Sequence, residues 1–179
     1  MRKNWLETDR VVPKICKILE ECAKQYEIDI KSIILYGSKA RGEIRSSNDY
    51  EIVLLVDDEI DTGNYIKLVN TIRIEFLKEK LINVNLLIYT PEVFEEILYK
   101  DENVGTFLYM ICKENTIIYD KKGTFTAIRK RMSSNNIKNE EIFINQCIIF
   151  AKKLGSAKWE QKWEKVLMQH RYLKRRNNY

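Results

Sequence analysis

The chain has 179 residues, of which 45% are apolar and 32% charged, with a formal net charge of +5 at pH 7. This composition is typical of a folded globular protein and excludes a mainly disordered one. The start, MRKNWLETDRVV, has no apolar stretch like that of a secretory signal, and no apolar run approaches the length that spans a bilayer. We therefore expect a cytoplasmic protein that does not contact membranes.

The first half of the chain alternates between helix and strand patterns. Apolar residues at helical spacing predict a helix over 11–26, with Pro13 in its first turn. A short β-rich run predicts a strand over 32–36, and the almost wholly apolar run 50–56 predicts a strand buried on both faces. Between this strand and the next, an apolar stripe predicts a long helix over 62–80.

The pattern continues to about residue 122. We predict a third strand over 82–89 and then a helix over 92–98, with Pro91 in its first position. A further helix over 104–113 and a short fourth strand over 116–119 follow. The predicted fold class is α/β (α+β), with a small mixed β-sheet flanked by helices.

After Gly123 the residue pattern becomes helical and the composition basic. Helices are predicted over 124–132, 138–154 and 158–175. The chain is therefore predicted to divide into a core, residues 1–122, and a C-terminal helical extension, residues 123–179.

The extension carries a positive net charge, whereas the core carries a negative one. This asymmetry has two interpretations: a solvated helix face, or a surface that meets RNA, DNA or an acidic partner. Trp159 and Trp163 lie four residues apart on one helix face and are expected to pack, with stacking on a base as the alternative.

Cysteines and histidine carry little functional signal. The four cysteines (Cys16, Cys22, Cys112 and Cys147) form no CxxC pair, and His170 is the one histidine in the sequence. Zinc sites and Cys/His nucleophiles therefore have little support, and we expect buried, reduced thiols.

The first half of a candidate site is the Gly-Ser pair in the run YGSKARG. Gly37 lets a phosphate approach the backbone closely. The Ser38 hydroxyl and free N–H groups of the turn can hold phosphate oxygens, and Lys39 and Arg41 add positive charge. Alone, such a pair is also typical of an ordinary turn.

The second half is the pair Asp49 and Glu51 at the head of a predicted strand. Residues two apart on a strand leave the same face, so Tyr50 and Ile52 point the other way. Neighbouring carboxylates repel each other unless they are solvated or bridged by a cation. Oxygen ligands suit Mg²⁺, and Mg²⁺ held against a triphosphate is what nucleotidyl transfer requires.

Together these pieces resemble the nucleotidyltransferase superfamily that includes DNA polymerase β. Ten residues separate Ser38 from Asp49, within the family pattern of Gly-Ser followed by Asp-x-[Asp/Glu]. The strings GSKARG and NDYEI are closer still to the minimal (MNT-type) nucleotidyltransferases, in which GSxARG and SDxDL are common. The resemblance covers roughly residues 10–120.

The resemblance implies roles for individual residues. Gly37 and Ser38 would hold the nucleotide phosphates, and Asp49 and Glu51 would bind Mg²⁺. Family members usually carry a third carboxylate on the next strand, which can act as the base. Here that position is Asn85 in VNLLIY, which has no charge and cannot take a proton.

Two functions therefore stay open. The first is transfer of a nucleoside monophosphate, AMP from ATP, with Mg²⁺ to a hydroxyl acceptor on a protein, a small molecule or RNA. MNT-type proteins are often antitoxins that modify a HEPN-type toxin, so such a toxin is one expected partner. The second is a weakened or inactive module that binds nucleotide, RNA or a partner protein, with its basic helices as the contact.

Overall fold

The computed structural model describes residues 5–42, 49–100, 102–134 and 140–176. The chain divides into two compact units. The first comprises Met1–Glu95 and Lys113–Ile128, and the second Glu96–Cys112 and Arg129–Tyr179. The boundary predicted after residue 122 stays a prediction.

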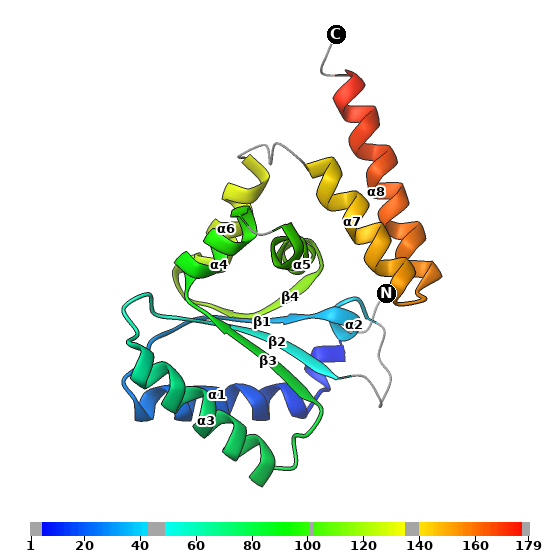
Figure 1. The fold of residues 1–179 in the computed structure, drawn as a ribbon. Coiled ribbons are helices and arrows are strands. Elements are labelled where there is room, and N and C mark those ends of the chain that lie inside the picture. The colour runs from blue at the N-terminus through cyan, green and yellow to red at the C-terminus, as the bar shows by residue number, and fades with distance from the viewer. Residues whose placement is uncertain (1–4, 43–48, 101, 135–139, 177–179) are drawn as a thin grey trace. The chain divides into compact units, whose positions relative to one another are not determined.

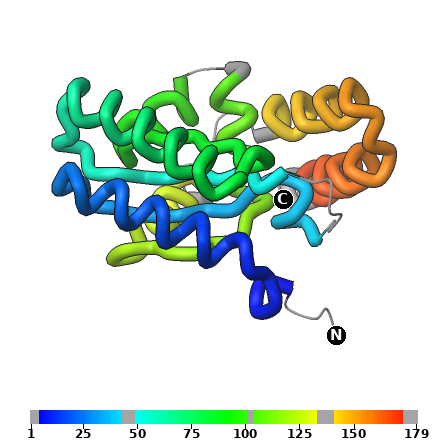
Figure 2. Tube along the Cα trace, turned by 90° about the horizontal axis from the view of Figure 1, so that it is seen from below, coloured from blue at the N-terminus to red at the C-terminus, as the bar shows by residue number. Residues whose placement is uncertain are grey.

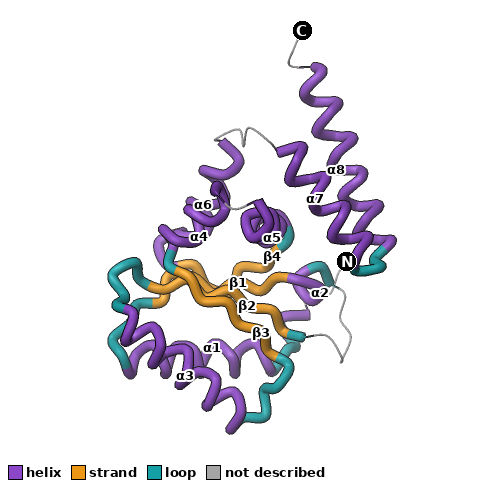
Figure 3. Tube along the Cα trace, viewed as in Figure 1, coloured by secondary structure: helices purple, strands orange, loops and turns teal. Residues whose placement is uncertain are grey.

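The first unit is built on a mixed four-stranded sheet, shown in Figures 1 and 3. Its strands are β1 (Ile30–Tyr36), β2 (Tyr50–Val56), β3 (Val84–Tyr89) and β4 (Asn115–Asp120). Their order is β3-β2-β1-β4; β1 runs antiparallel to β2 and β4, and β2 runs parallel to β3. The predicted fold class is confirmed.

Helices α1 (Val11–Gln25) and α3 (Thr62–Lys78) lie together on one face of this sheet (Figures 1 and 2). Their apolar stripes meet the inward side chains of the central strands, such as Leu35 and Leu54, which are fully buried. Burying one such side chain contributes about 1.5–3 kcal/mol relative to leaving it in water. This packing fixes β1 and β2, which frame the candidate site.

The predicted helix 62–80 is two residues too long, because α3 ends at Lys78. Lys80 adopts a positive φ of 55°, and its N–H donates to the Leu77 carbonyl oxygen. The N–H of Leu81 donates to the Phe76 carbonyl oxygen, which completes a Schellman motif. Since glycine usually fills the left-handed position and lysine fills it here, the sequence lacked the common stop signal.

The described part of the first unit also contains three short helical elements. They are η1 (Trp5–Glu7), α2 (Gly37–Ala40) and η2 (Lys121–Gly123). Helices α4 (Pro91–Lys100) and α6 (Thr124–Ser134) each begin in the first unit and end in the second. Pro91 opens α4, as predicted.

The second unit is helical and contains α5 (Glu102–Lys113), α7 (Glu140–Lys153) and α8 (Ala157–Arg176). The Tyr109 ring stacks on Phe143 at 5.1 Å between centroids and lies 6.3 Å from Trp163. Trp159 and Trp163 are buried, so they pack as expected. The start of the predicted helix 138–154, at residues 138 and 139, lies outside the described residues.

The cysteines carry free thiols; Cys22, Cys112 and Cys147 are buried and Cys16 is partly exposed. Loss of water around Cys16, with the Glu20 charge nearby, raises the pKa of its thiol to about 11. In the part of the chain that the structure describes, no helix combines the length and apolarity needed to cross a bilayer.

Candidate nucleotide-phosphate and metal site

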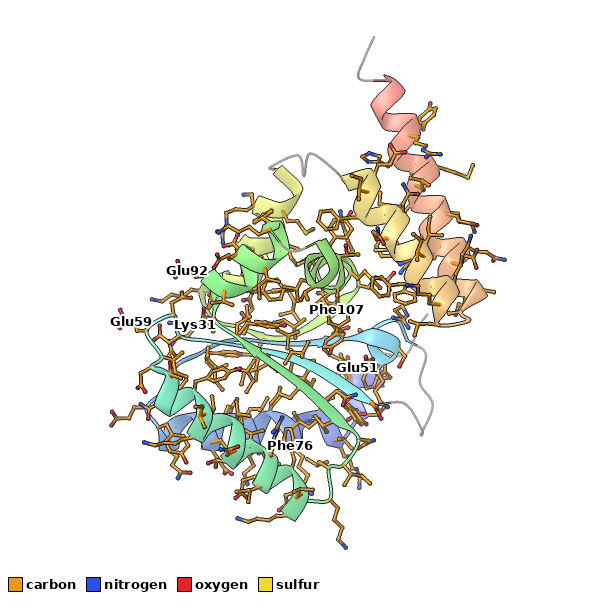
Figure 4. The ribbon with its side chains drawn as sticks, in the orientation of Figure 1. Lys31, Glu51, Glu59, Phe76, Glu92 and Phe107 are labelled. Atoms are coloured by element: carbon orange, nitrogen blue, oxygen red, sulfur yellow. The ribbon has the colours of Figure 1, made fainter. Side chains whose placement is uncertain are left out.

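The candidate site lies at the end of the sheet where β1 ends and β2 and β3 begin. Antiparallel register pairs Tyr36 with Glu51, and parallel register pairs Glu51 with Asn85. These side chains therefore stand in a row across three strands, on one face. Figure 4 shows Glu51 beside the short helix α2, with Lys31 at the opposite end of the sheet.

Gly37 and Glu51 are in close contact. Gly37 has a φ of +72°. A Cβ built on it would overlap Oε2 and Cδ of the Glu51 carboxylate. The backbone N–H of Ser38 donates to Oε2 of Glu51 at 3.3 Å. Position 37 therefore needs glycine twice, for its backbone angle and for the room it leaves. The turn holds an anionic group, here the chain's own carboxylate.

Asp49 and Asn85 form the neighbouring pair. The amide nitrogen Nδ2 of Asn85 donates to Oδ2 of Asp49 at 3.0 Å, and both side chains are exposed. The structure therefore brings Asp49, Glu51 and Asn85 together, as the motif predicted. Their predicted chemical roles stay predictions.

Glu51 has an unusual electrostatic environment. Loss of water raises the pKa of its half-buried carboxyl, and the charge of Asp49 raises it further. The Ser38 N–H and the positive charge of Arg41 act in the opposite direction, but the pKa stays above its ordinary value. Burial, together with the Glu51 charge, likewise raises the pKa of the Tyr36 hydroxyl. An ionised Glu51 is therefore poorly solvated here, and a cation would stabilise it.

Arg41 lies close to this carboxylate. Its Nη1 atom also lies 3.7 Å from Oε2 of Glu114, and the two side chains are only 16% and 6% exposed. Glu114 precedes β4, so the turn is connected to a second strand. No sequence signal pointed to Glu114, because its partner lies more than seventy residues away along the chain.

Lys39 points elsewhere. Its side chain is 4% exposed, and its Nζ atom lies 4.2 Å from the centroid of the Tyr50 ring. Tyr50 belongs to the core cluster that α1 and α3 cover, on the side of β2 opposite to Glu51. The phosphate-binding role predicted for Lys39 stays a prediction.

A pocket of about 680 Å³ adjoins the site. Tyr36, Glu51 and Asn85 line one part of it, and it continues along β3 and the side chains of α3 that include Tyr65 and Phe76. Its size is within the range of sites that hold small ligands. Space for a substrate group therefore exists beside the carboxylates.

The donor atoms fit a cation of the Mg²⁺ class. Asp49 and Glu51 supply carboxylate oxygens, and the Asn85 amide can present its oxygen after rotation, all of which Mg²⁺ accepts. Among the described residues, no group of three or more His, Cys, Asp or Glu side chains is arranged to hold a metal. Two carboxylates leave several coordination positions to water and phosphate oxygens, as is usual for Mg²⁺.

Comparison with known proteins identifies the family. The family model described as polymerase beta, nucleotidyltransferase matches residues 17–124, which is more than half of the chain. The chain belongs to this nucleotidyltransferase family. The superfamily predicted from the Gly-Ser and Asp-x-Glu motifs is thereby confirmed, and members of this family generally use a nucleoside triphosphate and a divalent metal.

Other comparisons add less about this nucleotidyltransferase. No curated protein matches it. A crystal structure of a toxin–antitoxin with AMP-PNP is similar, with a TM-score of 0.44 and 15% identity over 76% of this chain and 97% of the other. A crystal structure of a mutant of the toxin–antitoxin MntA-HpeT has a TM-score of 0.44 and 18% identity over 79% and 97% of the two chains.

Proposed function

We propose that this nucleotidyltransferase transfers AMP from ATP, with Mg²⁺, to a hydroxyl acceptor. The observation that carries the proposal is the Glu51 carboxylate seated in the turn of Gly37 and Ser38, next to Asp49. The Ser38 N–H donates to an anion here, so it suits a phosphate oxygen when Glu51 instead holds a cation together with Asp49.

In the proposed reaction the acceptor oxygen forms a bond to the α-phosphorus of ATP. The bond from that phosphorus to the β-phosphate bridging oxygen breaks, and pyrophosphate leaves. Gly37 and Ser38 hold phosphate oxygens, and Arg41 supplies positive charge beside them. Bound Mg²⁺, held by Asp49 and Glu51, would neutralise charge that develops on the phosphates.

The proton of the acceptor hydroxyl needs a separate route. Asn85 cannot accept it, because an amide has no basic group at neutral pH. One of the two carboxylates or a water molecule therefore takes the proton. This departure from the family pattern predicts slow turnover rather than loss of nucleotide binding.

For the acceptor we propose a HEPN-type toxin protein, with a tyrosine hydroxyl as the target. The support is the likeness of GSKARG and NDYEI to the strings of minimal nucleotidyltransferases, many of which act as antitoxins. The basic C-terminal helices would contact the partner. A small molecule or an RNA end remains an alternative acceptor for the same chemistry.

The direct test uses purified protein, labelled ATP, Mg²⁺ and each class of acceptor. Asp49→Ala is the inactivating variant, and Asp57→Ala is its matched control, because the two aspartates flank β2 at opposite ends. We expect label on one acceptor for wild type and Asp57→Ala, and none for Asp49→Ala. No transfer to any acceptor, with ATP bound normally, would favour a different function.

The second candidate function is that of a module that binds a nucleotide but does not catalyse its transfer. The hydrogen bond from Asn85 to Asp49 favours it, since this amide occupies the position where the family usually has a base. Calorimetry would then show ATP binding, and a coupled assay would show no pyrophosphate. Strong activity in Asn85→Asp alone would identify the natural protein as a weakened enzyme.

A further inference from the structure

Lys39 lies inside the predicted phosphate turn, yet its ammonium group does not face the site. The side chain is 4% exposed, and the recorded contact of its Nζ atom is the Tyr50 ring, 4.2 Å from the centroid. No carboxylate of the described residues forms an ion pair with it. A buried ammonium is unfavourable unless something compensates it, and the face of an aromatic ring does so in part.

Lys39 and Ser38 contact opposite faces of the same strand. Tyr50 and Glu51 are adjacent in β2, so their side chains leave the sheet on opposite sides. Ser38 contacts Glu51 on one side through its N–H, and Lys39 contacts Tyr50 on the other through its ammonium. The turn after β1 therefore holds the first residues of β2 from both faces.

Hydrogen bonds link Tyr50 through Asp9 to the start of helix α1. The Tyr50 hydroxyl donates to Oδ2 of Asp9 at 2.9 Å. The other oxygen of Asp9 accepts the N–H groups of Val11 and Val12, both at 2.8 Å, which caps the start of α1. The ring under Lys39 is thereby held by a helix terminus.

We propose that Lys39 is a positioning residue, which through Tyr50 and Asp9 fixes the phosphate turn in register with the carboxylate pair. It does not itself bind phosphate. The inference rests on the proposed function to the extent that the turn binds a nucleotide. It extends that function by assigning Tyr50 and Asp9, which no motif singled out, to the support of the site.

A double-mutant cycle tests the coupling. Lys39→Met removes the charge, Tyr50→Leu removes the ring, and calorimetry measures Mg²⁺–ATP affinity for each variant and for the double variant. We expect each single change to weaken binding about tenfold, and the double change to weaken it by about the same factor. Tyr50→Phe keeps the ring but loses the hydroxyl bond to Asp9, so its binding should fall between that of wild type and that of Tyr50→Leu.

Independent losses would overturn the proposal. If the double variant binds about a hundredfold more weakly than wild type, Lys39 and Tyr50 act separately. If Lys39→Met alone weakens binding and Tyr50→Leu does not, Lys39 is a phosphate ligand.

A second measurement needs no nucleotide. The exchange rate of the Ser38 amide hydrogen, followed by NMR, reports whether the turn keeps its place against Glu51. Lys39→Met should raise this rate severalfold, whereas Lys78→Met, at an exposed lysine paired with Glu75, should not. An unchanged rate in Lys39→Met overturns the proposal, even if Tyr50→Leu does not fold. If wild type binds no ATP, the proposed function fails, and this rate alone decides the role of Lys39.

Discussion

Replacing Gly37 with alanine separates two reasons for glycine at this position. The first is the backbone, since a φ of +72° is unfavourable for a residue with a side chain. The second is the Glu51 carboxylate, which occupies the space that the new Cβ needs. Gly42 is the matched control, because its φ is +76° and nothing lies within 4 Å of a Cβ built there.

The expected free-energy changes follow from these contacts. The left-handed backbone costs alanine about 1–2 kcal/mol at either position. At position 37 the Glu51 side chain must also move and lose its bond from the Ser38 N–H. Hydrogen bonds to charged groups contribute about 1.5–3 kcal/mol, and the partial exposure of Glu51 and its regained water reduce this term to about 1 kcal/mol. Gly37→Ala should therefore destabilise by about 1 kcal/mol more than Gly42→Ala.

Urea denaturation of both variants measures the difference. In a chain of this size, an extra 1 kcal/mol lowers Tm by roughly 2–4 °C. The double variant Gly37→Ala with Glu51→Ala should recover most of the extra loss, because the clash is gone. Calorimetry should show Mg²⁺–ATP binding lost in Gly37→Ala and retained in Gly42→Ala. Equal stability of the two single variants would refute the close contact between Gly37 and Glu51.

Three other substitutions test the electrostatics of the fold and the site. Because loss of water raises the pKa of Glu51, its ionised form costs stability above that pKa, so Glu51→Gln should raise Tm by a few degrees at pH 8 and by less at pH 4. Asn85→Asp places a second carboxylate next to Asp49. The Tm of this variant should be lower than that of wild type in EDTA and higher in millimolar Mg²⁺, as thermal unfolding with each additive will show. Burial acts to raise the pKa of Asp120, but the hydrogen bonds it accepts lower it overall. Its contribution is therefore present at neutral pH and is lost as the pH falls through this lowered pKa, so Asp120→Ala should cost about 1–2 kcal/mol at pH 7 and progressively less as the pH falls below about 4 in urea titrations.

Local sequence patterns predicted the elements that frame the site. The strand predicted over 50–56 is β2, because its apolar run is bounded by polar residues on both sides. The order of the strands was less accessible, since β1 pairs with β4 over a separation of about eighty residues. The end of α3 was missed because Lys80, rather than glycine, adopts the left-handed angle.

Within the site, spacing predicted which groups meet but not how they are paired. Gly37, Glu51 and Asn85 belong to one motif, and the sheet register places them together. The direction of the Lys39 side chain depends on Tyr50, and the Tyr50 hydroxyl on Asp9, forty-one residues earlier. Asp9 could have been found as a helix cap from its place before Val11. Its second role depends on tertiary packing, which no local pattern contains.

The hydrogen bonds of Asp49 and Glu51 also reduce the need of these carboxylates for a cation. From the sequence alone, adjacent carboxylates are unfavourable unless they are solvated or bridged by a cation. In the structure each has its own hydrogen-bond donor: the Asn85 amide serves Asp49, and the Ser38 N–H serves Glu51. A third carboxylate at position 85 would remove one donor and add a third negative charge. Asparagine therefore makes the metal-free site more stable and gives a cation less to neutralise, so metal should bind this protein weakly without the nucleotide phosphates.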